Sequence, residues 1–236
     1  CKFCASGLLK KKRDLTAAEM VGQVYTVNHL LKQEEGQARV SHVVVMGIGE
    51  PFDNYDNVMS FIRIINHPKA FAIGARHITV STCGIVPRIR QFAHEGIQVK
   101  LAISLHGPSD DIRNRIMPIN NRYPVAELID AAKYYEHVTN KRVTFEYILI
   151  DEVNDGIAQA RDLTKLIDGM LGHVNLIPYN PVDEHGFKRS RTAHQKAFFD
   201  YLMQHGVNTT LRKEFGTDID AACGQLRAKK ERERHV

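Results

Sequence analysis

Six short apolar segments rich in valine and isoleucine recur along the chain, and they limit its possible folds more than any other feature. Their apolar character is nearly continuous, which is typical of parallel strands that are buried on both faces. We therefore predict a parallel sheet. The predicted strands span residues 40–46, 77–81, 99–105, 143–150, 174–177 and 209–212.

Helical patterns lie between these segments. Thr16 and Glu19 form a Thr-x-x-Glu capping box, which predicts a helix that starts there and ends before Gly36. The apolar residues of this helix are spaced for one buried face. They are Met20, Val24, Val27 and Leu31.

Further helices are predicted downstream. Pro87 and Pro124 suit the first turn of a helix, and Gly96 would end the earlier of these two helices. Residues 155–170 and 190–205 fit two more helices. The buried face of the helix after Pro124 is predicted to contain Leu128, Ile129, Ala132 and Tyr135.

The alternation of strand and helix predicts an α/β fold with right-handed crossovers between parallel strands. Such a chain forms either an open doubly wound sheet or a complete or partial barrel, and the periodicity does not distinguish them. In each of these folds the reactive groups gather at the carboxyl ends of the strands.

The composition fits one domain. A chain of 236 residues with 43% hydrophobic residues is long enough for one large α/β core, which we assign to residues 1–226, with the charged residues 227–236 as a tail. No apolar run approaches the ~18 residues of a membrane span, and the start does not resemble a signal peptide. The four cysteines do not resemble a disulfide framework, so we expect a cytoplasmic protein. A net charge of +5 suits a polyanionic partner without establishing one.

Cys1 and Cys4 form a Cys-x-x-Cys pair. Two thiolates at this spacing bind zinc or an iron–sulfur cluster, or cycle as a dithiol; two unrelated structural cysteines are the remaining alternative. A zinc site would need a further Cys or His pair, whereas Cys83 and Cys223 are solitary. A cluster with three protein ligands would need one more cysteine upstream. Because the chain opens inside this motif, we expect a preceding segment in the whole protein.

An ordered set of motifs makes the chain resemble a known family. Cys1-Lys2-Phe3-Cys4 is similar to the second half of the radical S-adenosylmethionine (SAM) signature Cys-x-x-x-Cys-x-Phe-Cys. With the other motifs it resembles the radical SAM methyltransferases that act on carbon 2 of adenine in 23S ribosomal RNA and transfer RNA. This resemblance implies a partial (β/α)6 barrel. The other motifs are Gly47-Ile48-Gly49-Glu50-Pro51, Ser81-Thr82-Cys83-Gly84, Ser104-Leu105-His106, Met117-Pro118-Ile119-Asn120, residues 175–181 and residues 218–226.

The resemblance also implies which residues bind the cofactors. Cys1 and Cys4 would be two of the three thiolate ligands of a [4Fe–4S] cluster, and the third ligand is expected four positions before Cys1. One iron would stay open for SAM. The residues that would bind SAM are Gly49, Glu50, Ser81, Ser104, Leu105, His106 and Asn180.

These SAM-binding residues are less specific when they are taken singly. Gly49 and Glu50 follow an apolar run, where a turn with little side-chain bulk brings the backbone close to a ligand. A glycine-rich turn after a strand is common without a ligand, however. A lone histidine such as His106 is more often structural, and Asn180 lies in a Pro-containing turn. Cys83 is interpreted as a small packing residue.

Cys223 lies in a stretch of small residues, where an inert buried thiol is the ordinary expectation. The resemblance instead implies that Cys223 is the catalytic methyl carrier. Carbon 2 of adenine is electron-poor and does not attack a methyl donor, so the family passes the methyl through an S-methylcysteine and a radical reaction. A second cysteine, expected shortly upstream of Cys1, would resolve the enzyme–RNA adduct by forming a disulfide with Cys223.

The implied partners are 23S ribosomal RNA, transfer RNA and an electron donor such as flavodoxin, and we expect a monomer. Residues 10–13, Arg113, Arg115 and the basic tail are candidates for phosphate contacts, although solvated charge explains each of them singly. The family also recognises RNA through an amino-terminal domain, which would precede Cys1.

Three alternatives stay open. A sister activity methylates carbon 8 of the same ribosomal adenine and confers antibiotic resistance with similar motifs. A zinc-dependent RNA-binding module would use Cys1 and Cys4 for zinc and would not need SAM. Another radical SAM enzyme, acting on a small molecule, would not require Cys223.

Overall fold

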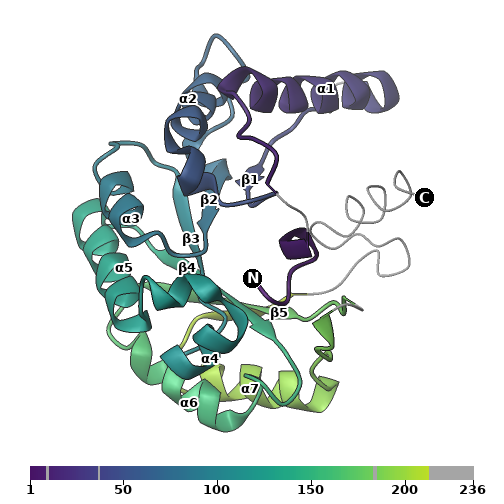
Figure 1. Ribbon diagram of the computed structural model, residues 1–236. Helices are drawn as coiled ribbons and strands as arrows, with labels where there is room; N and C mark the ends of the chain where they lie inside the picture. Colours follow the sequence, from purple (N-terminus) through teal and green to yellow (C-terminus); the bar gives the residue numbers. More distant parts are fainter. Residues whose placement is uncertain (9–10, 37, 183–184, 213–236) are drawn as a thin grey trace.

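The computed structural model describes residues 1–8, 11–36, 38–182 and 185–212, which form six parallel strands with helices between them (Figure 1). All six predicted strands are confirmed. Each is hydrogen-bonded to the next in chain order, so that β1 and β6 are the two edges of the sheet. The strands are β1 (Val43–Val45), β2 (Ile78–Thr82), β3 (Lys100–Ser104), β4 (Val143–Leu149), β5 (Gly172–Pro178) and β6 (Thr209–Leu211).

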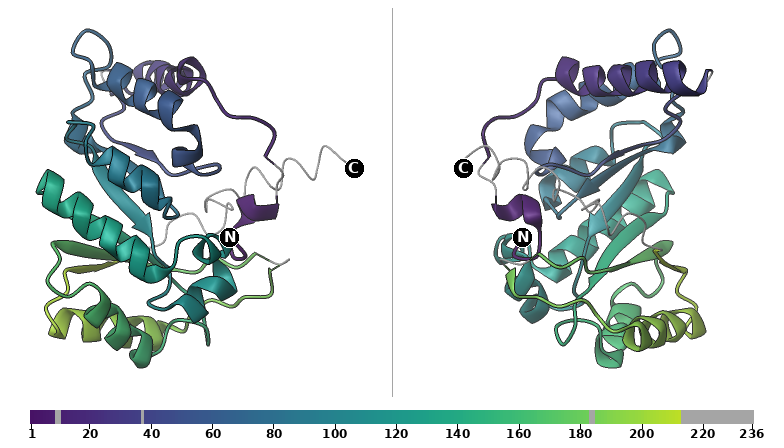
Figure 2. Two further views of the ribbon diagram at one scale, coloured as in Figure 1. Left: turned by 60° about the vertical axis from the view of Figure 1, so that its left-hand side comes forward. Right: turned by 90° about the vertical axis from the view of Figure 1, so that its right-hand side faces the viewer.

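The sheet curls into an open arc. Figure 1 shows the helices following one another around the convex side, and both views of Figure 2 show the start of the chain on the open, concave side. A doubly wound sheet would have helices on both faces and a reversal in strand order, whereas this sheet runs from β1 to β6 without a reversal. The partial barrel is therefore confirmed.

The structure contains two helices that the sequence did not predict, α2 and α4. α2 follows a 3-10 turn, η2 (Pro51–Asn54), and α4 follows β3. No described helix is both long and apolar enough to cross a membrane. The helices are α1 (Ala17–Glu35), α2 (Tyr55–Asn66), α3 (Val86–Phe92), α4 (Asp110–Ile116), α5 (Val125–Thr139), α6 (Ile157–Leu166) and α7 (Thr192–Gln204). The other 3-10 turns are η1 (Ala5–Leu8), η3 (Ala75–His77) and η4 (Pro118–Asn121).

α1 begins where the capping box predicts. The Thr16 hydroxyl accepts from the Glu19 backbone N–H, and the Glu19 carboxylate accepts from the Thr16 N–H. The predicted buried face is only partly right: Val24 is buried, but Val27 is 46% exposed. α1 lies at one end of the arc and packs mainly against α2, so much of its surface stays uncovered.

α5 buries the face that the sequence predicts, because Leu128, Ile129, Ala132 and Tyr135 are all buried. The Tyr135 ring stacks on Phe92 of α3 at 6.0 Å. α3 itself ends at Phe92, earlier than predicted, and a short turn leads from there to Gly96.

The two faces of the sheet differ in polarity. In β4, Phe145 and Tyr147 belong to the main hydrophobic core under the helices, while Glu146 between them faces the concave side. Ser104, Glu146 and Asn175 lie in register across β3, β4 and β5, and the Asn175 amide donates to the Glu146 carboxylate at 2.8 Å. The concave face is therefore partly polar, in contrast to the prediction that both faces are apolar.

Candidate functional site

The residues predicted to bind SAM lie at one edge of the sheet, the carboxyl ends of the strands. Gly49 and Glu50 follow β1, and Ser81 is the last but one residue of β2. Ser104 ends β3, and Asn180 comes two residues after β5. We call this edge the rim. Because the strands are parallel, their carboxyl ends bring together residues that are far apart in the sequence.

Glu50 connects the ends of two strands. Its Oε1 accepts from the Phe52 N–H at 3.0 Å and its Oε2 accepts from the Cys83 N–H at 2.7 Å. Gly49 has φ = +102°, a conformation that residues with a side chain rarely adopt. The turn after β1 is therefore fixed against β2, and each carboxylate oxygen keeps a lone pair for a cationic ligand.

Ser104, Leu105 and His106 continue the rim after β3. In the described part of the chain, neither the Ser81 nor the Ser104 hydroxyl has a hydrogen-bond partner, so both are available to a ligand. The Leu105 side chain is fully buried in the main core. The Leu105 side chain therefore does not point to the rim, and the contact of Leu105 with SAM stays a prediction.

His106 is buried on the concave side with φ = +57°. Its Nδ1 accepts from the Ile148 N–H at 3.1 Å, so the ring proton is on Nε2. Burial, helped by the positive charge of Arg113, lowers the pKa of His106 to about 3. His106 is therefore neutral at physiological pH and adds no positive charge to the rim.

His106 should make the fold acid-sensitive. Its pKa is about 3 in the folded chain against 6.5 for an exposed histidine, so the unfolded state binds the extra proton as the pH falls below 6.5. Stability from this group is complete above pH 6.5 and is lost by about 1.4 kcal/mol for each pH unit below it. Asparagine can accept a hydrogen bond from the Ile148 N–H and tolerates positive φ, so it suits this position. Between pH 7 and pH 4, we expect the free energy of unfolding in urea to fall less for His106→Asn than for wild type.

The matched control for this experiment is the exposed His137, on the outer layer of helices. His137→Asn should keep the wild-type acid dependence. An unchanged pH profile in His106→Asn would contradict the assignment of a buried, neutral imidazole.

The prediction that Arg113 contacts RNA phosphates is wrong. Its side chain is completely buried, and its guanidinium binds backbone carbonyl groups beneath the rim. Arg115, two residues later on α4, is exposed, and its phosphate contact stays a prediction.

The Cys-x-x-Cys motif lies against the concave side of the rim. The Lys2 N–H donates to the Ile116 carbonyl at 2.8 Å, and the Phe3 ring meets the His106 ring edge-on at 5.0 Å. The Cys4 carbonyl lies 3.1 Å from the His185 Nε2. These contacts hold the cysteines beside the residues predicted to bind SAM.

The donor chemistry of this motif fits an iron–sulfur cluster. Cys1 is exposed, Cys4 is partly buried, and neither is in a disulfide. Thiolates are the ligands that such clusters prefer. The described residues thus supply two of the ligands of such a cluster, Cys1 and Cys4.

Comparison with known proteins decides the family. The family model described as "Radical SAM superfamily" matches residues 1–164. The chain belongs to the radical SAM superfamily. Members of this superfamily use a [4Fe–4S] cluster and SAM.

Three known proteins resemble this radical SAM chain over nearly its whole length. It is 60% identical to a probable dual-specificity RNA methyltransferase RlmN of Spiroplasma citri, in an alignment that covers 98% of this chain and 66% of the relative. The protein of the same name from Streptococcus suis is 56% identical, over 99% of this chain and 65% of the relative. A solved radical SAM methyltransferase from Sphaerobacter thermophilus superimposes with a TM-score of 0.92 at 47% identity, over 97% of this chain and 66% of that chain. The chain thus spans about two thirds of the length of these proteins.

Cys83, which also lies at the rim, differs from Cys1 and Cys4 in its apolar surroundings. It is partly buried and packs into a small hydrophobic cluster with Phe3, Met117 and Tyr179. Burial, together with the nearby Glu50, raises its thiol pKa far above the ordinary value. A thiol that stays protonated is a poor metal ligand, which agrees with the interpretation of Cys83 as a packing residue.

Cys223 and the boundary predicted after residue 226 lie outside the described residues. The catalytic role of Cys223 therefore stays a prediction. The basic residues 10 and 227–236 also lie outside them.

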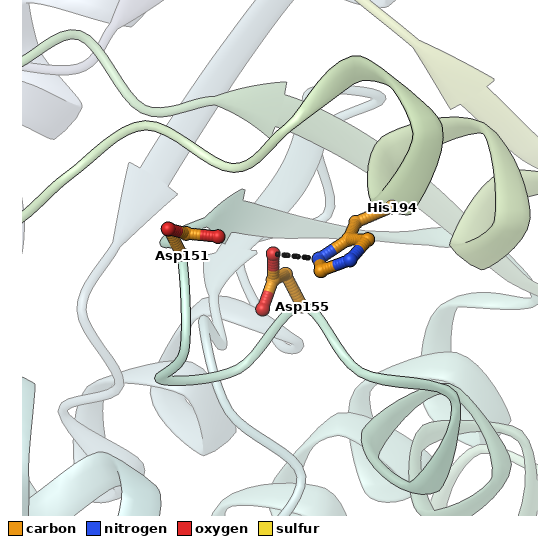
Figure 3. Close-up of side chains that lie close together, drawn as sticks. All are labelled: Asp151, Asp155 and His194. Carbon is orange, nitrogen blue, oxygen red and sulfur yellow. Dashed lines mark hydrogen bonds and ion pairs between the residues drawn. The ribbon is translucent and has the colours of Figure 1, made fainter.

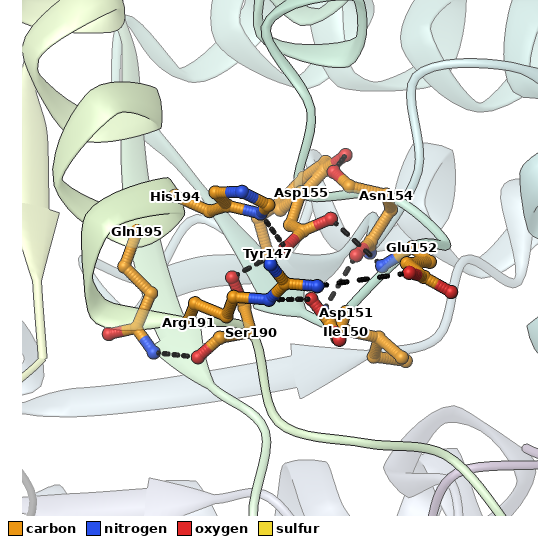
Figure 4. Close-up of polar contacts among 10 residues, drawn as sticks. All are labelled: Tyr147, Ile150, Asp151, Glu152, Asn154, Asp155, Ser190, Arg191, His194 and Gln195. Carbon is orange, nitrogen blue, oxygen red and sulfur yellow. Dashed lines mark hydrogen bonds and ion pairs between the residues drawn. The ribbon is translucent and has the colours of Figure 1, made fainter.

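A second group of metal-ligating residues lies after β4 in this radical SAM barrel (Figure 3). Asp151, Asp155 and His194 each offer a ligand atom within 4.8 Å of the others. Asp155 Oδ2 accepts from the Ser190 hydroxyl at 2.6 Å and lies 3.1 Å from His194 Nδ1. The Arg191 guanidinium lies 3.7 Å from Asp151 Oδ1 (Figure 4). This network joins the loop after β4 to the start of α7.

The sequence analysis missed two polar residues that shape the radical SAM rim. Asn154 is fully buried, donates to the carbonyls of His106 and Ile148 at 2.7 Å, and accepts from the Ile150 N–H. Glu146 faces the concave side, where burial raises its pKa. A carboxylate inside the apolar run 143–150 was the available signal for Glu146, whereas Asn154 lies in the polar stretch after that run and is not marked by any pattern.

Proposed function

We propose that the protein is a radical SAM methyltransferase that transfers a methyl group to carbon 2 of adenine in 23S ribosomal RNA and transfer RNA. The observation that carries this proposal is the 56–60% identity to probable dual-specificity RNA methyltransferases over 98–99% of the chain. The solved methyltransferase with a TM-score of 0.92 supports the transferase chemistry. The choice of carbon 2 rests on the motifs in the sequence.

The residues of the rim have distinct roles in this proposal. Cys1 and Cys4 hold the cluster. At the turn after β1, the Glu50 carboxylate accepts hydrogen bonds from the ammonium group of SAM, and Gly49 leaves room for the ligand. Ser81, Ser104 and Asn180 contribute polar groups to the same ligand. When bound, the cluster and SAM supply the methyl group and the carbon-centred radical. The neutral His106, in contact with Phe3, adds no positive charge to this part of the rim.

Cys223 is proposed to carry the methyl group as a thioether. Carbon 2 of adenine is electron-poor, so it accepts a carbon radical but does not attack a methyl donor. A cysteine that holds the methyl group close to the base provides the required intermediate. The proposed partners are ribosomal and transfer RNA in the cytoplasm and an electron donor of the flavodoxin type, with the protein acting as a monomer.

The test uses the whole protein, purified and reconstituted with iron and sulfide without oxygen. It is incubated with SAM, a reductant and RNA that lacks the modification, and digested nucleosides are analysed by mass spectrometry. The expected product is 2-methyladenosine from both RNA classes. 8-Methyladenosine would support the carbon-8 alternative, and an active small-molecule reaction without RNA methylation would reject an RNA substrate. Bound zinc in place of iron would reject radical chemistry.

A further inference from the structure

We propose that Arg113 is a positioning residue that holds the ends of β2 and β3 in the conformation that binds SAM. Arg113 lies on α4, behind the rim, and was not among the residues expected to serve SAM. The inference rests on the proposed binding of SAM at the rim, and it does not depend on methylation of RNA.

The guanidinium of Arg113 connects two strand ends. Its Nη1 donates to the Ser104 carbonyl at 2.9 Å and also to the Leu105 carbonyl, and its Nη2 donates to the Cys83 carbonyl at 3.2 Å. One planar group thus binds three backbone carbonyls: that of the last residue of β3 and those of the residues directly after β3 and β2. The directions of the five guanidinium N–H groups are fixed, so these carbonyls are held relative to one another.

The fourth bond of Arg113 fixes the guanidinium itself. Its Nε donates to Asn120 Oδ1 at 2.9 Å, and the Asn120 amide donates to Asp110 Oδ1 at 2.9 Å. Among the described residues, no carboxylate contacts the guanidinium directly, although the side chain is fully buried. Burial lowers the pKa of Arg113 only to about 10, so it stays charged at neutral pH. A buried cation without a direct ion pair is unfavourable unless backbone dipoles compensate it, and here the rim carbonyls do so.

Gly107 permits this arrangement. A Cβ at Gly107 would lie 2.6 Å from the Ile112 side chain and 3.4 Å from Arg113 Cγ. Only a residue without a side chain lets α4 approach the rim closely enough for Arg113 to reach the three carbonyls.

The segment that Arg113 holds ends in a strained residue. His106 has φ = +57°, which is unfavourable for a residue with a side chain and persists only where the surroundings fix it. The backbone carbonyl of Glu146 accepts from the N–H groups of Leu105 and His106, and the Asn154 amide donates to the His106 carbonyl. Arg113 fixes the two preceding carbonyls, so the whole segment is constrained from both ends before any ligand binds.

A purely structural role makes a different prediction from a positioning role. Loss of a structural contact lowers the stability of the chain and leaves the affinity of the folded fraction for SAM unchanged. Loss of a positioning contact raises the dissociation constant and KM for SAM in protein that is still folded, while kcat at saturating SAM changes little.

The experiment compares Arg113→Lys, Arg113→Met and Arg161→Met in the whole, cluster-loaded protein. Lysine keeps the charge but lacks the planar fork, and methionine removes the charge. Arg161 is an exposed arginine of α6 on the outer layer and serves as the matched control. The SAM dissociation constant is measured by equilibrium dialysis, and kcat and KM for SAM are measured from 5′-deoxyadenosine formation. Amide exchange of Leu105 and His106 is followed in cluster-free protein.

We expect Arg113→Lys to raise the dissociation constant and KM for SAM about 10-fold or more, with kcat within about 3-fold, and to speed exchange of the two amides about 10-fold. Arg113→Met should have a larger effect, and Arg161→Met none. A folded Arg113→Lys protein with wild-type SAM affinity, or one that loses only kcat, would overturn the inference.

Asn120→Ala covers the case in which both Arg113 variants fail to fold. It removes the bond that orients the guanidinium, together with the Asn120 bonds to Asp110 and Asn114, and keeps Arg113 itself. It should raise the SAM dissociation constant about 3-fold or more. Wild-type affinity in folded Asn120→Ala would then overturn the inference. If wild-type protein binds SAM but does not methylate RNA, the proposed function fails, whereas the role of Arg113 is still decided by these SAM measurements.

Discussion

Replacement of Cys4 by alanine is expected to abolish cluster binding and to lower the rate of SAM cleavage at least about 10³-fold. Cys4 is one of two thiols that the structure places beside His106, and its carbonyl contact to His185 fixes the loop that carries it. An iron–sulfur cluster that loses one thiolate ligand is released or degraded. Iron and sulfide content, the visible absorbance of the cluster and 5′-deoxyadenosine formation provide the measurements.

Cys83→Ala is the matched control for this substitution. Both changes remove one thiol at the rim, but Cys83 is partly buried, and its raised pKa keeps it protonated. Cys83→Ala should retain the full iron content. Full iron content in Cys4→Ala would show that the cluster does not depend on the Cys-x-x-Cys motif, and a colourless, zinc-loaded wild-type protein that loses its zinc in Cys4→Ala would point to the zinc alternative.

Replacement of Cys223 by alanine is expected to lower RNA methylation at least about 10³-fold, because the methyl group would then have no covalent carrier. The dissociation constant for SAM should stay within about 2-fold of wild type, since the proposed SAM ligands are all residues of the rim. RNA methylation is measured from 2-methyladenosine, and SAM binding by equilibrium dialysis.

Peptide mass spectrometry of the intact enzyme gives an independent measure of the same role. The peptide that contains Cys223 should gain the mass of one methyl group after incubation with SAM, and the peptide that contains Cys83 should not. Persistent RNA methylation by Cys223→Ala would reject the carrier role. It would favour a radical SAM reaction of another kind.

The corrections to the sequence analysis have a common physical cause. Arg113 was interpreted as a candidate for phosphate contacts because of its charge, but only the approach of α4 to the rim determines that its side chain is buried. Val27 matched the periodicity of a buried helix face, yet α1 has one neighbouring helix and leaves that position exposed. Periodicity reports which side of a helix is apolar, whereas burial depends on what the fold places against it.

The sequence by itself determined the six parallel strands, the start of α1, the buried face of α5 and the radical SAM membership of the chain. These features depend on local patterns: apolar runs, a capping box, helical spacing, and cysteines a fixed number of positions apart. Only the tertiary structure decided that the sheet is an open arc. It also decided that Glu50 joins β1 to β2, that Arg113 binds three carbonyls of the rim, and that His106 is neutral. The physical reason is that hydrogen-bond geometry and desolvation act between residues far apart in the chain, so they exist only once the strands are assembled.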